Sequence, residues 1–289
     1  MCELLGMSSN IPATLSLSLM KLAEHGGLSG PHKDGWGVAY YEGPDVRVIK
    51  EAEAAAESEW VRFLKQHDIR SPIVIAHIRR ATMGARSYRN TQPFARELAG
   101  RMHLFAHNGW LPGINESPAF KPTRFRPVGE TDSETAFCAL LGRMSAVWNR
   151  PDEIPSPEER LTVVSTFAAE LRMLGPANFL YSDGDILFAH GHRRKQGTSS
   201  KIEPPGLVYL QRRCGQGRRG FVASGLSIEG ADQVITLVAS VSLTDEPWQP
   251  LDEGEVIAIS KGQVTPHRPA ARNEVENGSS ALRDWNRER

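Results

Sequence analysis

The feature that most constrains the fold is a pair of amphipathic helices in the middle of the chain, with strand-like segments on both sides. Each predicted helix carries one apolar stripe, formed in residues 133–148 by Phe137, Leu140, Leu141, Met144 and Trp148, and in residues 158–174 by Leu161, Val164, Ala168 and Leu171. Residues 149–157 connect them. The order strands, two helices, strands predicts one α+β domain in which helices cover large sheets.

The strand predictions depend on apolar runs bounded by turn residues. "GWGVAYYEG" and "VRVIK" are typical of paired strands, and "PIVIAHI" is typical of a strand buried on both faces. Residues 11–27 fit a strand or a helix; we favour a helix that Gly26 and Gly27 end. Further strands are expected in "CELLGM", "RMHLFAHNG", "NFLYSDG", "DILFAHG", "GLVYLQ", "GFVAS", "VITLVAS" and "EVIAIS".

Charge and cysteine content narrow the function classes. The chain has 289 residues with 34 Lys+Arg and 34 Asp+Glu, which gives no reason to expect a nucleic-acid or membrane partner. Three widely spaced cysteines do not form a disulfide framework, so we expect a reducing compartment, the cytoplasm. No signal peptide is expected, because Glu3 stands where a basic segment should be.

Oligomeric state is left open. We expect one domain over residues 2–267 and a flexible tail over residues 268–289.

Cys2, directly behind Met1, has two interpretations. It is either an ordinary buried cysteine or, after removal of Met1, the N-terminal residue. In the second case its α-amine, with an ordinary pKa near 8, acts as a general base beside its own thiol. Position alone favours the first interpretation.

Three more polar stretches interrupt apolar runs. "HNG" (107–109) offers two donors to an oxyanion, the Asn108 amide and the Gly109 N–H, but Asn-Gly is also a common turn. "HIRRATMG" (77–84) contains two neighbouring arginines. They either bind a carboxylate or are simply exposed to solvent. "GETDSE" (129–134) contains Asp132, which has two interpretations. It is either the N-cap of a helix or a carboxylate that binds a substrate ammonium.

Together these stretches, with "NTQPF" (90–94) and in this order and spacing, resemble the class II glutamine amidotransferases, which are N-terminal-nucleophile (Ntn) hydrolases. "PHKDGWGVAYYEG" (31–43) is similar to the stand-alone YafJ-type subgroup. The resemblance implies a four-layer αββα sandwich. Motifs carry it from Cys2 to about residue 140, and it continues more loosely through residues 242–256.

The resemblance also implies a role for each matching residue. Cys2 matches the nucleophile, with its amine as the base, and Asn108 and Gly109 match the oxyanion hole. Arg79 matches the group that holds the substrate α-carboxylate, and Asp132 the one that holds its α-ammonium. The expected pocket also includes Thr82, Trp36 and Arg80. Arg80 and Met83 depart from the residues that many family members carry there.

No synthetase domain, phosphate loop, dinucleotide motif or metal pattern is visible, so we expect no cofactor and no metal. One expectation is hydrolysis of glutamine, with ammonia released or passed to a separate synthetase partner. Another is hydrolysis of a different γ-glutamyl amide or peptide, as in glutathione or ergothioneine pathways. A third is an inactive protein that binds γ-glutamyl ligands.

Overall fold

The computed structural model describes residues 2–67, 69–148, 150, 153–196, 201–214, 221–223, 226–228 and 232–265. The tail expected at 268–289 lies outside these residues, so its flexibility stays a prediction. Strand pairing among the described residues is antiparallel in two large sheets. The predicted α+β architecture is confirmed.

The first sheet has seven strands in the order β15-β11-β14-β1-β4-β2-β3. β1 lies next to β4 and β14, so the start of the chain is placed in the interior of this sheet. The strand bounds are β1 (Glu3–Ala13), β2 (Trp36–Glu42), β3 (Asp45–Glu51), β4 (Ser71–Ile78), β11 (Val208–Cys214), β14 (Gln233–Ala239) and β15 (Gln249–Pro250).

The second sheet has six strands in the order β17-β16-β8-β7-β6-β5, and two short hairpins complete the strand list. The sheet is formed by β5 (Phe94–Leu98), β6 (Arg101–Gly109), β7 (Ala177–Ser182), β8 (Leu187–His190), β16 (Val256–Ser260) and β17 (Gln263–Val264). The hairpins pair β9 (Arg194–Lys195) with β10 (Ile202–Glu203) and β12 (Phe221–Ala223) with β13 (Leu226–Ile228).

In the part of the chain that the structure describes, four α-helices and three short 3₁₀ helices join these strands. They are α1 (Ser16–His25), α2 (Glu59–Gln66), α3 (Asp132–Val147), α4 (Pro157–Leu171), η1 (Ala55–Glu57), η2 (Tyr88–Asn90) and η3 (Pro118–Phe120). Three of the α-helices begin at a hydroxyl side chain that accepts a hydrogen bond from an N–H of the first turn: Ser58 for α2, Thr131 for α3 and Ser156 for α4. No helix among the described residues has the length and apolar character needed to cross a membrane.

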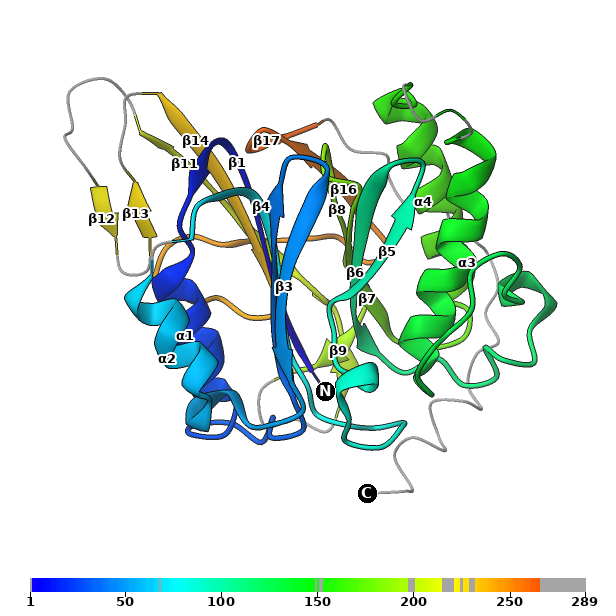
Figure 1. Ribbon diagram of the computed structural model, residues 1–289, viewed down its shortest axis with the longest axis horizontal. Coiled ribbons are helices and arrows are strands. Elements are labelled where there is room, and N and C mark those ends of the chain that lie inside the picture. The colour runs from blue at the N-terminus through cyan, green and yellow to red at the C-terminus, as the bar shows by residue number, and fades with distance from the viewer. Residues whose placement is uncertain are drawn as a thin grey trace.

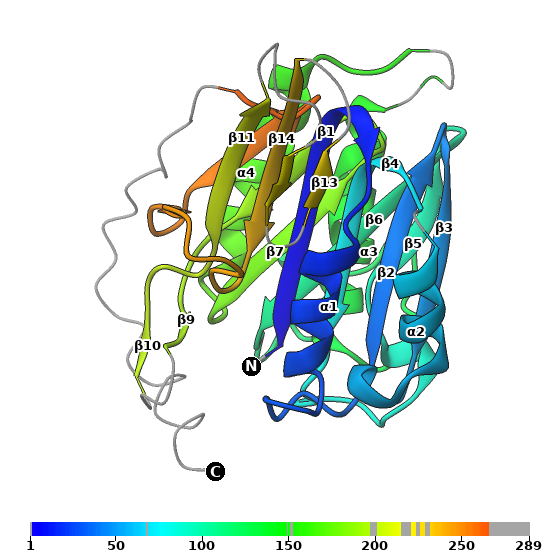
Figure 2. The same cartoon turned by 90° about the vertical axis from the view of Figure 1, so that its left-hand side faces the viewer.

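Three separate apolar cores stack these elements into four layers, α-β-β-α. One core lies between α1, α2 and the first sheet, one between the two sheets, and one between the second sheet and α3 and α4. Figure 1 shows the layers edge-on, and Figure 2 shows α1 and α2 covering the first sheet. The four-layer αββα sandwich expected from the resemblance is therefore confirmed.

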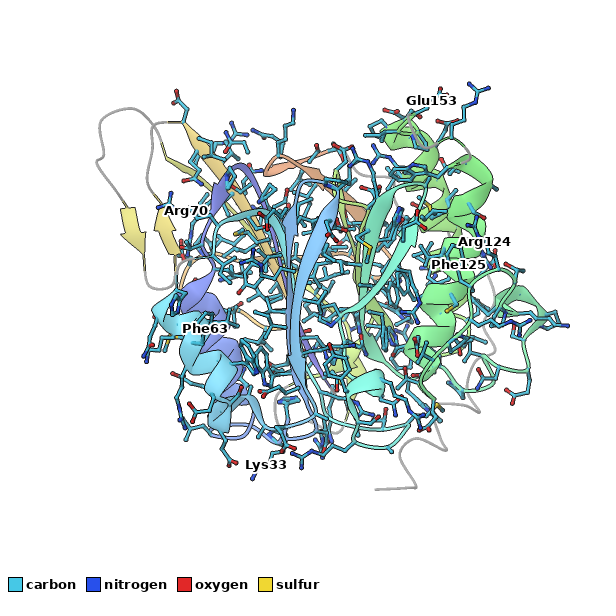
Figure 3. All side chains as sticks on the ribbon, viewed as in Figure 1. Lys33, Phe63, Arg70, Arg124, Phe125 and Glu153 are labelled. Atoms are coloured by element: carbon cyan, nitrogen blue, oxygen red, sulfur yellow. The ribbon has the colours of Figure 1, made fainter. Side chains whose placement is uncertain are left out.

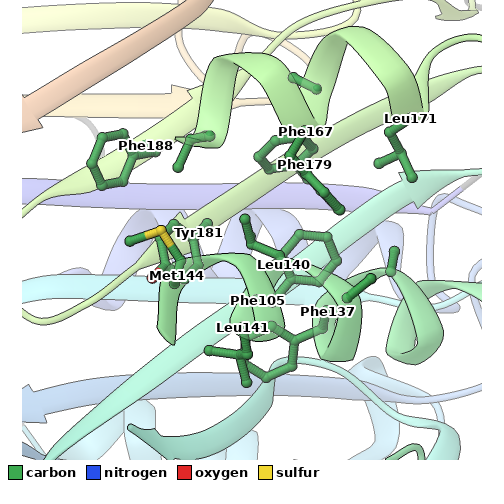
Figure 4. Packing of buried hydrophobic residues seen from close by; sticks show 14 of the residues in the cluster. Phe105, Phe137, Leu140, Leu141, Met144, Phe167, Leu171, Phe179, Tyr181 and Phe188 are labelled. Carbon is green, nitrogen blue, oxygen red and sulfur yellow. The ribbon is translucent and has the colours of Figure 1, made fainter. Parts of the chain in front are cut away.

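The core under α3 and α4 is rich in aromatic side chains. Phe105 stacks on Phe137 with ring centroids 5.4 Å apart, and Phe167 meets Phe179 edge-on at 5.8 Å. Figure 4 shows these rings between the two helices and the sheet. The apolar stripes predicted for the two central helices point into this core. Cys138 of α3 is also fully buried.

The structure also corrects element boundaries. In α2 only Leu64 is buried, and Phe63 remains 42% exposed (Figure 3). The first strand runs on to Ala13, so α1 occupies only the second half of the segment 11–27. Gly26 ends this helix as expected.

Candidate active site

The period-2 alternation of the first sheet points Cys2 and Arg79 into the space between the sheets. Leu4 belongs to the core between the sheets, whereas Leu5 packs under the helices. Cys2 precedes Leu4 by two residues and shares its face. In β4 the same reasoning applies, because Ile75 belongs to the core between the sheets and Arg79 follows it by four residues.

The second sheet supplies the facing group. Ala106 of β6 lies in the core between the sheets, while Phe105 packs under the helices. Asn108, two residues after Ala106, therefore points toward the first sheet and is fully buried. Residues widely separated in sequence thus meet between the two sheets.

The Cys2 thiol lies against the backbone of Arg80. The Arg80 N–H donates to Sγ at 3.3 Å, and the Arg80 carbonyl oxygen lies 3.4 Å from Sγ. Burial raises the pKa of the Cys2 thiol; the Arg80 hydrogen bond and the charge of Arg79 lower it, while the charge of Asp132 raises it. Cys2, Arg79 and Asp132 are thus close enough to interact electrostatically.

Arg79 is 3% exposed, and its guanidinium group donates hydrogen bonds to backbone carbonyls. Its Nη2 donates to Met83 at 2.9 Å and Gly84 at 3.0 Å, and its Nη1 donates to Ala85 at 3.2 Å and Asp34 at 3.4 Å. Within the described part of the chain, no carboxylate forms an ion pair with it. A buried cation without an anion is costly, so this arrangement favours binding of an anion from outside.

The loop that encloses Arg79 is fastened by Asn90, the first residue of "NTQPF". The Asn90 amide donates to Ala85 O at 2.9 Å and accepts from Glu130 N–H at 2.9 Å. The Asp34 carboxylate accepts from Ala81 N–H at 2.8 Å. These bonds connect the arginine loop to the segment that begins α3.

Asp132 lies in the first turn of α3, but it is not the N-cap that the sequence pattern predicted. Thr131 is the N-cap and accepts from Glu134 N–H, so Asp132 is the first helical residue. Its carboxylate is nearly buried and accepts from Leu111 N–H at 2.9 Å and Ser133 N–H at 2.8 Å. These donors and the helix N-terminus stabilise a negative charge there.

Asn108 and Gly109 end β6 opposite Asn178 and Ala177 of β7. The Asn108 Nδ2 donates to Ser240 Oγ at 3.3 Å, and its carbonyl oxygen accepts from Asn178 Nδ2 at 2.9 Å. A Cβ atom at Gly109 would lie 1.9 Å from Pro176 O, so only glycine fits. The "HNG" sequence therefore ends a buried strand; it is not the turn of a hairpin.

Two buried histidines lie beside these residues, His77 on the inner face of the first sheet with Ile75 and His107 on the outer face of the second sheet with Phe105. His107 donates or accepts at Nδ1 with Ser133 Oγ at 2.9 Å, and burial lowers its pKa to about 4, against an opposing effect of Asp132. Burial, together with Arg79 and His107, lowers the pKa of His77 well below its usual range. Both rings are therefore neutral at pH 7. Among the described residues, no group of three or more His, Cys, Asp or Glu side chains is arranged to hold a metal ion.

The side chains of the remaining pocket candidates make none of the contacts described above. Thr82 is exposed in the loop after Arg79, and Arg80 is half-buried. Trp36 is buried in the core under α1 and α2, where its indole N–H donates to Glu51 at 3.0 Å. A pocket role for these three residues stays a prediction. Sequence reasoning gave no role to Asn90 within its motif and missed Ser240 entirely, since a serine ending an apolar run carries no distinct signal.

Comparisons with known proteins agree on one family. The family model described as "Glutamine amidotransferases class-II" matches residues 1–282. The putative glutamine amidotransferase YafJ of Escherichia coli is 37% identical over 264 residues, which cover 88% of this chain and 96% of that protein. A putative glutamine amidotransferase of Haemophilus influenzae is 30% identical, with 91% and 85% covered.

Two solved structures show the same fold. A predicted glutamine amidotransferase from Pseudomonas aeruginosa is 36% identical and covers 92% of this chain and 100% of its own, with a TM-score of 0.64. Glutamine phosphoribosylpyrophosphate amidotransferase from B. subtilis is 17% identical, with a TM-score of 0.57. Here the match covers 94% of this chain and 50% of that one, and the likeness concerns the fold alone.

Proposed function

The chain belongs to the class II glutamine amidotransferase family, and from this premise we propose that it is an N-terminal-cysteine amidohydrolase. It cleaves the γ-amide of glutamine and releases glutamate and ammonia. The observation that carries the proposal is the buried Arg79 guanidinium, which forms no ion pair with a carboxylate among the described residues and interacts electrostatically with Cys2 and Asp34.

Arg79 and Asp132 bind the two charges of the substrate's α-amino-acid head. The Arg79 guanidinium takes the α-carboxylate as its missing anion, and the Asp132 carboxylate takes the α-ammonium. Both groups are held by backbone hydrogen bonds, so neither has to be ordered when the substrate binds. Thr82 and Arg80, in the same loop, line the pocket further out, and Trp36 supports it through packing.

Cys2 performs the chemistry after Met1 has been removed. Its free α-amine accepts the thiol proton, and the thiolate attacks the δ-carbonyl carbon of the substrate. The Asn108 side-chain amide and the Gly109 N–H stabilise the oxyanion of the tetrahedral intermediate, each contributing about 3 kcal/mol. The protonated amine then gives its proton to the leaving ammonia, and water hydrolyses the γ-glutamyl thioester to glutamate.

The burial of Cys2 makes this base necessary. Burial raises the pKa of the Cys2 thiol, so few thiolates form at pH 7 without a proton acceptor. Among the described residues, neither neighbouring histidine hydrogen-bonds to Sγ, and His107 bonds Ser133 instead. The amine of the same residue is the acceptor that the chemistry requires.

A second candidate is hydrolysis of another γ-glutamyl amide or peptide. The Arg79–Asp132 pair recognises the glutamyl head and sets no limit on the leaving amine, which favours this alternative as well as glutamine. A third candidate, an inactive γ-glutamyl-binding regulator, requires Met1 to be retained. We propose a cytoplasmic enzyme without a cofactor, which acts on a small molecule alone or supplies ammonia to a synthetase partner.

A release assay tests these candidates. Purified protein is incubated with glutamine, glutathione and a series of γ-glutamyl amides, and glutamate release is measured. Cys2→Ala should abolish release, whereas Cys138→Ala, at a buried core position of α3, should retain it. Full turnover by Cys2→Ala would refute the mechanism. Intact-mass measurement should show loss of Met1, and a fully retained methionine would favour the inactive regulator.

A further inference from the structure

Ser240 joins the start of β1 to the Asn108 amide across the space between the sheets. Its Oγ accepts from Leu4 N–H at 3.0 Å and lies 3.3 Å from Asn108 Nδ2. Ser240 is 4% exposed and Asn108 is fully buried, so water does not replace these contacts. We propose that Ser240 is a positioning residue, whose hydroxyl group fixes the orientation of the Asn108 amide so that its NH₂ donates to the substrate oxygen.

Two polar groups at this contact, one on Ser240 and one on Asn108, have no hydrogen-bond partner among the described residues. With Asn108 Nδ2 facing it, Ser240 Oγ accepts two hydrogen bonds and its own proton has no acceptor among the described residues. Asn108 Oδ1 is likewise buried without a partner there. A buried donor and a buried acceptor left unpaired side by side are unfavourable.

Turning the Asn108 amide by 180° pairs the Ser240 hydroxyl proton with Oδ1 and leaves the NH₂ group as the one unpaired group at this contact among the described residues. The two ends of an asparagine amide have the same shape, so hydrogen bonding decides which end faces which neighbour. In the turned orientation the Ser240 hydroxyl donates to Oδ1 and still accepts from Leu4 N–H. The NH₂ group then occupies the side where Oδ1 has no partner, and it is free to donate to a developing oxyanion.

Both residues of the contact are held by further bonds. The Ser240 carbonyl oxygen accepts from Arg194 Nη1 at 2.5 Å, and the Ser240 N–H donates to Leu4 O at 3.0 Å. The Asn108 carbonyl oxygen accepts from Asn178 Nδ2 at 2.9 Å. The hydroxyl group therefore acts from a fixed position. Ser240 directly follows β14 and lies opposite Leu4, which is two residues from Cys2 in the chain.

This inference rests on the proposed function, since it assigns the Asn108 NH₂ to the oxyanion of the same reaction. A donor that acts only on the oxyanion changes kcat and leaves KM nearly unchanged. The loss of Ser240 should therefore slow turnover without weakening substrate binding. A purely structural role would instead add its effect to that of any other variant.

A double-mutant cycle makes this distinction. Asn108→Ala should lower kcat about 10²–10³-fold, and Ser240→Ala about 10–100-fold, with KM within about threefold of the parent. The double variant should be no slower than Asn108→Ala, because Ser240 acts only through that amide. Ser240→Thr, which keeps the hydroxyl, should restore most of the rate. Ser8→Ala, which removes a buried hydroxyl bonded to Gly262 N–H, serves as the control.

Multiplicative effects in the double variant, or an equal loss in Ser240→Ala and Ser8→Ala, would overturn the proposal. Circular dichroism and thermal melting of each variant separate slow turnover from unfolding. If the unsubstituted enzyme releases no glutamate, the proposed function fails, and the orientation is decided without turnover. Neutron diffraction of the deuterated protein should place the Ser240 hydroxyl deuteron on the line to Asn108 Oδ1. Two amide deuterons facing Ser240 would contradict the inference.

Discussion

Replacing Arg79 with lysine keeps the positive charge but removes the planar fork that a carboxylate binds. In the structure, the two Nη atoms of Arg79 reach four carbonyl groups on separate residues, which a single ammonium cannot span. A hydrogen bond to a charged group contributes about 1.5–3 kcal/mol. Loss of a hydrogen bond to the substrate carboxylate should cost about 2 kcal/mol, or about thirtyfold in kcat/KM.

The assay compares two substrates that differ only in that carboxylate. Glutamine carries it, and 4-aminobutanamide lacks it. The parent enzyme should prefer glutamine strongly, and Arg79→Lys should lose about thirtyfold with glutamine while its rate with 4-aminobutanamide stays nearly unchanged. Arg47→Lys is the matched control, because Arg47 is exposed on β3 and its ion pair among the described residues is with Glu42.

An equal loss with both substrates would refute the reasoning. It would mean that Arg79 acts by supporting the loop at Met83–Ala85 and not by binding the carboxylate. Thermal melting of both variants shows whether the loop bonds contribute to stability independently of this effect.

Three further predictions concern the fold that holds the site. Gly109→Ala should destabilise the protein by about 2–3 kcal/mol and abolish turnover, because the alanine Cβ would lie 1.9 Å from Pro176 O. Denaturant unfolding measures the first effect and the release assay measures the second. Arg160→Met leaves the buried Asp183 carboxylate unpaired and should cost about 3–5 kcal/mol in denaturant unfolding; a cost below about 1 kcal/mol would contradict it. Burial lowers the pKa of His190 to about 3 and of His107 to about 4, so both stay neutral in the fold while the unfolded chain takes up protons below pH 6.5. The free energy of unfolding should therefore be constant above pH 7. It should fall by about 1–2 kcal/mol per histidine between pH 6.5 and 5. A free energy of unfolding that does not change in that range would contradict this prediction.

Much of the layer order follows from local sequence patterns. The apolar run of β4 and the stripes of α3 and α4 are properties of neighbouring residues, and these elements form where the sequence predicts them. The motifs with "HNG" and "HIRRATMG" also indicate that distant polar groups belong together. The structure brings Arg79 and Asn108 into the space between the sheets through strand parity alone.

What the sequence does not show depends on contacts between distant residues. β1 continues through Asn10 because its side chain bonds Val234 N–H and Asp232 O of the neighbouring segment, which no local pattern reveals. β5, with the sequence "FAREL", was not predicted as a strand, because Arg96 and Glu97 interrupt its apolar pattern. Arg96 instead pairs with the buried Glu134 at the start of α3.

The N-cap of α3 was misplaced by one residue for a similar reason. Thr131 and Asp132 are both favourable caps, and only the bond from Glu134 N–H to Thr131 Oγ1 decides between them. The correction strengthens the case for Asp132 as a ligand group, because its carboxylate is not used as the cap. Ser240 is invisible in the sequence because its importance comes from Leu4 and Asn108, on two different sheets.

The most direct test of the central claim is a mass map of the protein after reaction with a diazoketone analogue of glutamine, which alkylates an activated thiol beside a glutamine site. We predict one adduct, on an N-terminal Cys2 from which Met1 has been removed, and protection of that site by excess glutamine. Glutamate release that persists after Cys2 is fully alkylated, or that occurs in protein with Met1 still attached, would contradict the account.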